Sequence, residues 1–146
     1  MAKNVLISAC LLGEPCRFDG QGKHNSGLLE LLKDSALIPV CPEVEGGLGI
    51  PRPPAEIRSG GVYRQNGEEV SKAFTTGAAI CTEKAVSAQV TQAILKSRSP
   101  ACGCGQVYDG SFSGRLTEGD GIFTQHLKVA GIRCISDEDY LKEMDQ

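Results

Sequence analysis

The sequence predicts a three-layer α/β/α fold, Rossmann-like or flavodoxin-like, in which helices cover both faces of a mostly parallel sheet. Short apolar runs alternate with segments of helical periodicity, in the order strand, helix, strand, loop, helix, strand, helix, strand, helix. That alternation is typical of a parallel sheet built from βαβ units. The chain has 146 residues, which is enough for one domain with a single core. We therefore expect residues 1–146 to form one α/β domain.

The first third of the chain contains two predicted strands and a short helix. Residues 4–9 form a mostly apolar run, which predicts a buried strand. Ser26 is placed to cap a short leucine-rich helix after a turn-rich loop. Residues 36–40 predict the second strand, and Pro39 within it favours a position at the edge or end of the sheet.

The middle third combines an irregular segment with the longest predicted helix. Residues 42–67 are rich in glycine and proline, and loops of that length are usually functional or mobile. Residues 70–92 place apolar side chains at three- and four-residue spacing, which predicts a helix. Residues 93–97 either continue this helix or begin a third strand, because periodicity alone does not distinguish the two. Residues 99–105 predict a loop.

The last third predicts a helix, a strand and a terminal helix. Asp120 is placed to cap a helix that ends at Gly131. Residues 132–135 predict a short final strand. Ser136 and Asp139 have the spacing of a capping box at the start of the terminal helix.

Composition argues against several classes of function. The net charge is −3, the aromatic content is 5% and there is no tryptophan, which together argue against binding to a nucleic acid polymer. No apolar run approaches the ~20 residues needed to span a bilayer, so we expect no membrane partner. The apolar run at the N-terminus is too short for a signal peptide. The expected location is the cytoplasm.

The cysteines carry the main functional signal. There are seven, an odd number, which without an export signal favours metal or redox chemistry over disulfides. Cys10 and Cys41 follow the first two predicted strands, Cys102 follows the possible third, and Cys16 lies in the loop after Cys10. In open α/β sheets, ligands bind outside the carboxyl ends of the strands. We therefore expect these thiols to gather at one edge, although cysteine is also common in buried strands for packing reasons alone.

Two other cysteines are expected to have a packing role only. Cys81 lies on the apolar face of the long predicted helix, and Cys134 lies inside the final predicted strand. Both positions suit a small core residue.

The spacing leaves two kinds of metal site open. A structural zinc site usually takes four ligands that include two close pairs, and the only close pair is Cys102 with Cys104, whose role is ambiguous. The two histidines, His24 and His126, lie in a glycine-rich loop and in the middle of a predicted helix. Three well-separated thiolates instead suit an iron–sulfur cluster in which one iron stays open to a substrate atom.

Three longer motifs and two shorter ones follow one another along the chain. Residues 8–20 read Ser-Ala-Cys-Leu-Leu-Gly-x-x-Cys-Arg-Phe-Asp-Gly, and residues 41–56 read Cys-Pro-Glu-Val-x-Gly-Gly-Leu-x-x-Pro-Arg-x-Pro-x-Glu. Residues 95–103 read Leu-Lys-x-x-Ser-Pro-x-Cys-Gly, and residues 108–114 and 118–121 read Tyr-Asp-Gly-x-Phe-Ser-Gly and Glu-Gly-Asp-Gly. In this order the motifs resemble those of the thiouracil desulfidase family, formerly a family of unknown function, over nearly the whole chain.

The resemblance implies an oxygen-sensitive [4Fe-4S] cluster on three cysteines, a cofactor that aerobic purification can strip. The free iron would take the sulfur of a small thiocarbonyl substrate such as 2-thiouracil, and water would replace that sulfur without net redox change. Carried over to this sequence, the ligands are Cys10, Cys41 and Cys102, with Cys16 as an alternate ligand or nearby thiol. One departure is Ala101, which stands where the family commonly has a second serine, so that catalysis would rely on Ser99.

Two polar residues are candidates for catalysis. Glu43 lies two residues beyond Cys41 and is placed to act as a general acid/base; the alternative is a carboxylate that caps or orders the loop. Ser99 is placed to donate a hydrogen bond to the substrate or to a cluster sulfur, or else to form the turn that follows. Arg52 and Glu56 are expected to form an ion pair that pins the long irregular segment over the site.

The leading interpretation is thus an iron–sulfur desulfidase. The alternative is a non-catalytic cysteine-rich protein that binds zinc or an iron–sulfur cluster structurally, or that senses redox state. The alternative predicts four protein ligands, with Cys16 or Cys104 completing the set, and no pocket.

Overall fold

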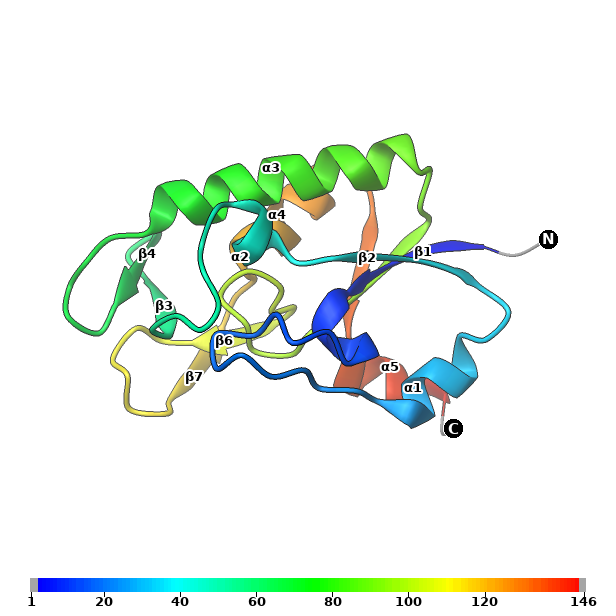
Figure 1. Ribbon diagram of the computed structural model, residues 1–146, viewed down its shortest axis with the longest axis horizontal. Coiled ribbons are helices and arrows are strands. Elements are labelled where there is room, and N and C mark those ends of the chain that lie inside the picture. The colour runs from blue at the N-terminus through cyan, green and yellow to red at the C-terminus, as the bar shows by residue number, and fades with distance from the viewer. Residues whose placement is uncertain (1–2, 145–146) are drawn as a thin grey trace.

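A computed structural model describes residues 3–144 and confirms the three-layer α/β/α architecture (Figure 1). Its centre is a four-stranded sheet with the spatial order β2-β1-β5-β8. The strands are β1 (Asn4–Ser8), β2 (Ala36–Val40), β5 (Gln92–Leu95) and β8 (Arg133–Ser136), and every neighbouring pair is parallel. The ambiguous residues after the long helix therefore form a strand. Pro39 lies in an edge strand, as predicted.

The register of the strands aligns their carboxyl ends. Ser8 at the end of β1 is paired with Val40 at the end of β2, and Leu95 is paired with Ser136 at the ends of β5 and β8. The chain leaves β1 toward β2 on one side and later returns to β5 on the other, so the order of strands reverses between β1 and β5. Sheets of this kind open a crevice at such a reversal, outside the carboxyl ends.

Helices bury both faces of this sheet (Figure 1). On one face, α3 (Ser71–Ser87) and α4 (Ile122–Val129) bring Phe74 and Phe123 against Leu6 of β1. On the other face, α1 (Ser26–Leu31) brings Leu28 against Val5 and Ile7 of the same strand, and α5 (Asp137–Met144) packs there too. Alternate residues of β1 thus enter different cores, which explains why its sequence is continuously apolar.

Shorter elements surround the carboxyl edge of the sheet. They are a 3-10 helix, η1 (Ala9–Leu12), a short helix, α2 (Pro42–Glu45), and two antiparallel hairpins, β3 (Ala55–Arg58) with β4 (Gly61–Arg64) and β6 (Gln106–Tyr108) with β7 (Leu116–Glu118). The segment 42–67 is therefore more regular than the sequence suggested. Ser59 and Gly60 both have positive φ, the geometry of a two-residue hairpin turn, and their Ser-Gly pair was the available sequence signal.

The structure corrects two of the predicted helix caps and confirms one. Asn25, not Ser26, caps α1, because the Asn25 Oδ1 accepts a hydrogen bond from the Leu28 N–H at 3.0 Å. Asp120 does not cap α4, since its carboxylate accepts instead from the Gly105 N–H and from Lys128.

At the last helix the predicted cap is present. The Ser136 Oγ accepts a hydrogen bond from the Asp139 N–H at 3.1 Å, directly before α5. Within residues 3–144, no helix combines the length and apolar character needed to cross a membrane.

Two glycines let α2 lie directly against α3. A Cβ atom at Gly77 would collide with the carbonyl of Pro42, and a Cβ atom at Gly46 would collide with the carbonyl of Ala73. Because neither partner is a flexible side chain, a larger residue at either position would push α2 away from α3. The placement of α2, which carries Glu43, therefore depends on these glycines.

We predict that Gly77→Ala lowers the free energy of unfolding by ~1–3 kcal/mol, because the clash outweighs the gain in helix propensity. Gly27→Ala is the matched control. Gly27 lies in a different helix, α1, and a Cβ atom at this position would meet nothing closer than 3.7 Å. Urea denaturation of both variants provides the measurement. Equal stability of the two variants would contradict this account of the α2–α3 contact.

Candidate active site

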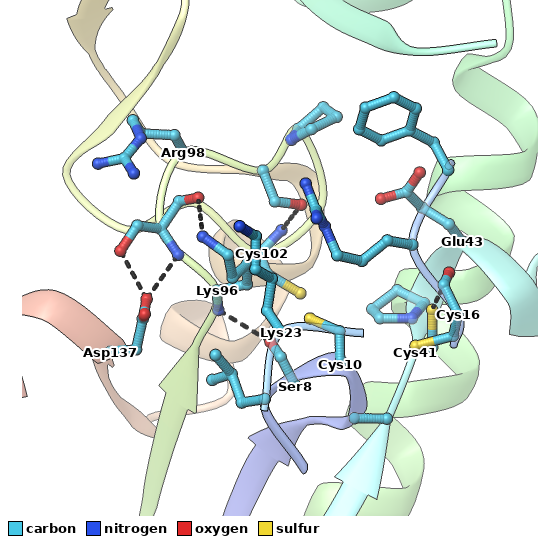
Figure 2. A pocket seen from close by; sticks show the side chains of 18 of the residues that line it. Ser8, Cys10, Cys16, Lys23, Cys41, Glu43, Lys96, Arg98, Cys102 and Asp137 are labelled. Carbon is cyan, nitrogen blue, oxygen red and sulfur yellow. Dashed lines mark hydrogen bonds between the residues drawn. The ribbon is translucent and has the colours of Figure 1, made fainter. Parts of the chain in front are cut away.

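A cavity of about 620 Å³ opens at the carboxyl edge of the sheet, where the order of strands reverses. Its lining comes from the ends of β1 and β2, from the loops after η1 and β5, and from the start of α5. Figure 2 shows side chains from these separate segments directed into one space. The cavity lies where ligands bind in open parallel sheets.

Four thiols line this cavity, and they are the four that the sequence placed at this edge. They are Cys10 in η1, Cys16 in the following loop, Cys41 after β2 and Cys102 in the loop after β5. All four are free, and Cys10 and Cys102 are buried whereas Cys16 and Cys41 are half-buried. In Figure 2 the sulfur atoms of Cys10 and Cys102 point toward each other, as do those of Cys16 and Cys41.

The environment of each thiol sets its protonation. Burial raises the pKa of Cys10 to about 11, although the charge of Lys96 opposes the shift, and burial raises the pKa of Cys102 well above its ordinary value. The Cys16 and Cys41 side chains share a hydrogen bond, which lowers the pKa of Cys41 to about 7 and raises that of Cys16. Cys41 is therefore the thiol that ionises most readily.

A buried guanidinium connects three segments around the cavity. Arg52 is 7% exposed and makes three hydrogen bonds, from Nε to Glu43 Oε1 at 3.1 Å, from Nη1 to the Gly49 carbonyl at 3.0 Å and from Nη2 to the Cys16 carbonyl at 3.0 Å. Its own backbone N–H donates to the Phe18 carbonyl at 2.7 Å. One side chain thus ties the Cys16 loop to the segment that carries Glu43.

Glu43 lies in the first turn of α2 and lines the cavity. Pro42 before it occupies the first helical position, where its missing N–H costs nothing, and an acidic residue in this turn is favoured by the helix dipole. Burial raises the pKa of the Glu43 carboxyl above its ordinary value, while Arg52 opposes the shift. The carboxylate is therefore both held in place and partly removed from water.

The predicted ion pair between Arg52 and Glu56 is wrong, because Arg52 pairs with Glu43 instead. Glu56 also lines the cavity, but its Oε1 accepts hydrogen bonds from the backbone N–H groups of Gly110 and Phe112 at 3.0 and 3.2 Å. Glu56 thus fastens the loop between β6 and β7 to β3.

Ser99 lines the cavity and also orders the turn that carries Cys102. Its Oγ accepts hydrogen bonds from the N–H groups of Ala101 and Cys102 at 3.1 and 3.0 Å. Ala101 itself is 1% exposed, belongs to the hydrophobic core and does not line the cavity. The departure at position 101 therefore changes the core rather than the cavity wall.

The sequence did not reveal every polar residue of the cavity. Asp137 is buried and accepts hydrogen bonds from the Ser97 N–H at 2.8 Å and from the Ser97 hydroxyl at 2.6 Å. Arg98, which also lines the cavity, pairs through both terminal nitrogens with the Glu138 carboxylate at 2.8 Å. Asp137 directly follows β8, so the argument that placed the cysteines at the carboxyl edge of the sheet also applied to it.

The other three cysteines do not line the cavity. Cys81 is fully buried on α3 and Cys134 packs against the same core, as predicted for packing residues. Cys104 is half-buried, and burial raises the pKa of its thiol; the charges that act on it are those of Lys128, Asp120 and Asp139, none of which lines the cavity. Among residues 3–144, no three His, Cys, Asp or Glu side chains are arranged to hold a single metal ion.

Comparison with known proteins identifies relatives over almost the full length. The model of a family described as 2-thiouracil desulfurase matches residues 5–139. A Bacillus subtilis (strain 168) protein, called uncharacterized protein YbbK, is 34% identical over 145 residues, which span 92% of this chain and 96% of that protein. Among solved structures, the [4Fe-4S]-dependent thiouracil desulfidase TudS is 39% identical, with a TM-score of 0.89 over 97% of this chain and 94% of TudS.

Proposed function

This chain belongs to the 2-thiouracil desulfurase family, and we propose that it is a [4Fe-4S]-dependent desulfidase acting on a small thiocarbonyl compound such as 2-thiouracil. The net reaction exchanges one sulfur for one oxygen: a thiocarbonyl and water give a carbonyl and hydrogen sulfide, with no change in oxidation state. The observation that carries the proposal is the convergence of free thiols from three strand ends on one cavity beside a carboxylate.

The donor set at this cavity fits an iron–sulfur cluster. Thiolates are the usual ligands of such clusters, and the cavity presents four free thiols within one lining. We assign Cys10, Cys41 and Cys102 as the ligands, because each follows a different strand of the sheet. Cys16 is the alternate, since it lines the same cavity and its carbonyl accepts a hydrogen bond from the Cys41 thiol.

Held by these three cysteines, the cluster would supply an iron able to take the sulfur atom of the substrate. The protein contributes the surroundings of that iron. Burial favours the neutral thiol at Cys10 and Cys102, so that ligation by thiolates releases protons from the site. Lys96 lies close enough to Cys10 for its charge to favour the thiolate.

Glu43 is our candidate for the general acid/base. Its carboxylate lines the cavity, and Arg52 holds one of its two oxygens. In this position the carboxyl group would take a proton from the attacking water or give one to the departing sulfur or ring nitrogen. Glu43 does not cap a helix, because its side chain is hydrogen bonded to Arg52 rather than to a helix N–H. Through Arg52 it does help to order the Cys16 loop, and this role is compatible with proton transfer by the second carboxylate oxygen.

Ser99 is our candidate for binding the substrate. Its oxygen already accepts two backbone hydrogen bonds, which leaves its hydroxyl proton as the group that the side chain can donate. The turn-forming role and the substrate-binding role are thus compatible. The first orients the hydroxyl for the second.

The alternative function is a non-catalytic metal or redox protein, and the presence of a pocket weighs against it. Such a protein needs no pocket, whereas the thiols here line a cavity of about 620 Å³. Cys104 lies outside that cavity, so only Cys16 remains to complete a four-cysteine set. We place the protein in the cytoplasm, where a reducing environment suits free thiols.

We predict that Glu43→Gln retains the iron and visible absorbance of the reconstituted protein but lowers turnover of 2-thiouracil by ~10²–10⁴-fold, the range typical of a general acid/base. The glutamine side chain has the same shape as that of glutamate, and its carbonyl oxygen can still accept the hydrogen bond from Arg52. Iron analysis and uracil release, both measured without oxygen, separate cofactor binding from catalysis. Loss of the cluster in this variant, or full activity, would contradict the assigned role.

A panel of cysteine variants tests the ligand assignment. Each of Cys10→Ser, Cys41→Ser and Cys102→Ser should prevent assembly of the cluster, because each variant removes one of its three protein ligands. Cys104→Ser is the matched control and should bind the same amount of iron as the wild type. Cys16→Ser should also retain iron, whereas loss of iron in Cys16→Ser but not in Cys41→Ser would exchange these two assignments.

A further inference from the structure

The Glu43 carboxylate has two oxygens in different situations. Oε1 accepts a hydrogen bond from Arg52 Nε at 3.1 Å. Among the residues that the structure describes, no other side chain is hydrogen bonded to this carboxylate. Oε2 is therefore the oxygen that is free to exchange a proton with a molecule in the cavity.

Arg52 is built into the protein firmly enough to define that orientation. Its side chain is 4% exposed and that of Glu43 is 17% exposed. Besides Glu43, the guanidinium binds two backbone carbonyls, those of Gly49 and Cys16. These three bonds use the fixed fork of a guanidinium, which a lysine ammonium cannot reproduce.

The same guanidinium also acts on the thiol side of the cavity. The Cys16 carbonyl that accepts from Arg52 Nη2 lies 3.7 Å from the Cys41 sulfur. Figure 2 shows Glu43, Cys16 and Cys41 along one wall of the cavity. Arg52 thus contacts both the candidate acid/base, Glu43, and the loop segment beside Cys41, a candidate cluster ligand.

We propose that Arg52 is the positioning residue of this enzyme: it holds Oε1 of Glu43 so that Oε2 transfers the proton, and it fixes the Cys16 loop against Cys41. The inference rests on the proposed desulfidase function. Arg52 acts through Glu43 and exchanges no proton with the substrate itself.

A double-variant experiment tests the action through Glu43. Arg52→Lys and Arg52→Gln, reconstituted without oxygen, should lower kcat by about 10-fold or more while KM changes little, as expected when an interaction serves only the chemical step. The double variant Glu43→Gln/Arg52→Gln should be no slower than Glu43→Gln alone, because residues that work as one unit are not additive. Arg64→Gln, which breaks an exposed ion pair with Glu68 in another part of the protein, is the control.

A second measurement uses the cluster-free protein and requires no activity. In Arg52→Gln, iodoacetamide should alkylate Cys16 several-fold faster than in the wild type, because the Cys16 carbonyl loses the guanidinium that holds this loop and keeps only the weak, long contact with the Cys41 thiol. Cys104 serves as the internal reference in the same sample, since it lies outside the cavity.

The outcomes are distinct. Wild-type protein that assembles no cluster or releases no uracil would overturn the proposed function, and alkylation would still report on the Arg52 contacts. Additive losses in the double variant, or an effect confined to KM, would overturn the positioning role. Loss of iron in both Arg52 variants would also overturn it, by assigning Arg52 to assembly of the site alone.

Discussion

Parallel pairing of β1 with β2 and β5 is the constraint on which the rest of the structure depends. The register places Ser8 opposite Val40 and Ile7 opposite Ile94, so the chain leaves neighbouring strands at the same edge of the sheet. Segments that are far apart in sequence then begin their loops side by side. Because the order of strands reverses between β1 and β5, the loops diverge and leave a cavity between them. The thiols meet because the backbone topology brings them together, whatever their own interactions contribute.

The cavity is costly for stability, which is typical of a functional site. Two thiols, a carboxylate and a guanidinium are largely removed from water there, and each loses solvation that must be replaced. Three hydrogen bonds replace the lost hydration of the Arg52 guanidinium, and two hydrogen bonds from Ser97 replace that of the Asp137 carboxylate. Within residues 3–144, the buried thiols of Cys10 and Cys102 have fewer partners, that of Cys102 being hydrogen bonded to the Ser8 side chain. Binding a metal cluster would stabilise these groups, so that cofactor binding and folding are coupled.

Much of this site could be predicted from the sequence, and the remainder shows where sequence reasoning ends. The positions of Cys10 and Cys41 followed from short-range patterns. Each cysteine comes directly after an apolar run that predicts a strand, and ligands bind outside the carboxyl ends of strands in open α/β sheets. The partner of Arg52 did not follow, since Glu43 and Glu56 are both near it in sequence and only the fold decides between them. The role of position 101 was equally hidden, because neighbouring residues of one loop can point into the core or into the cavity. These choices depend on long-range packing, which local periodicity does not report.

The central claim is that this cavity holds an iron–sulfur cluster that removes sulfur from a thiocarbonyl compound. Its most direct test is to purify the wild-type protein without oxygen, reconstitute it with iron and sulfide, and measure bound iron together with uracil and sulfide released from 2-thiouracil. The account predicts about four irons per chain and equal amounts of uracil and sulfide. A chain that assembles no cluster but binds zinc tightly, and that releases neither product, would contradict it.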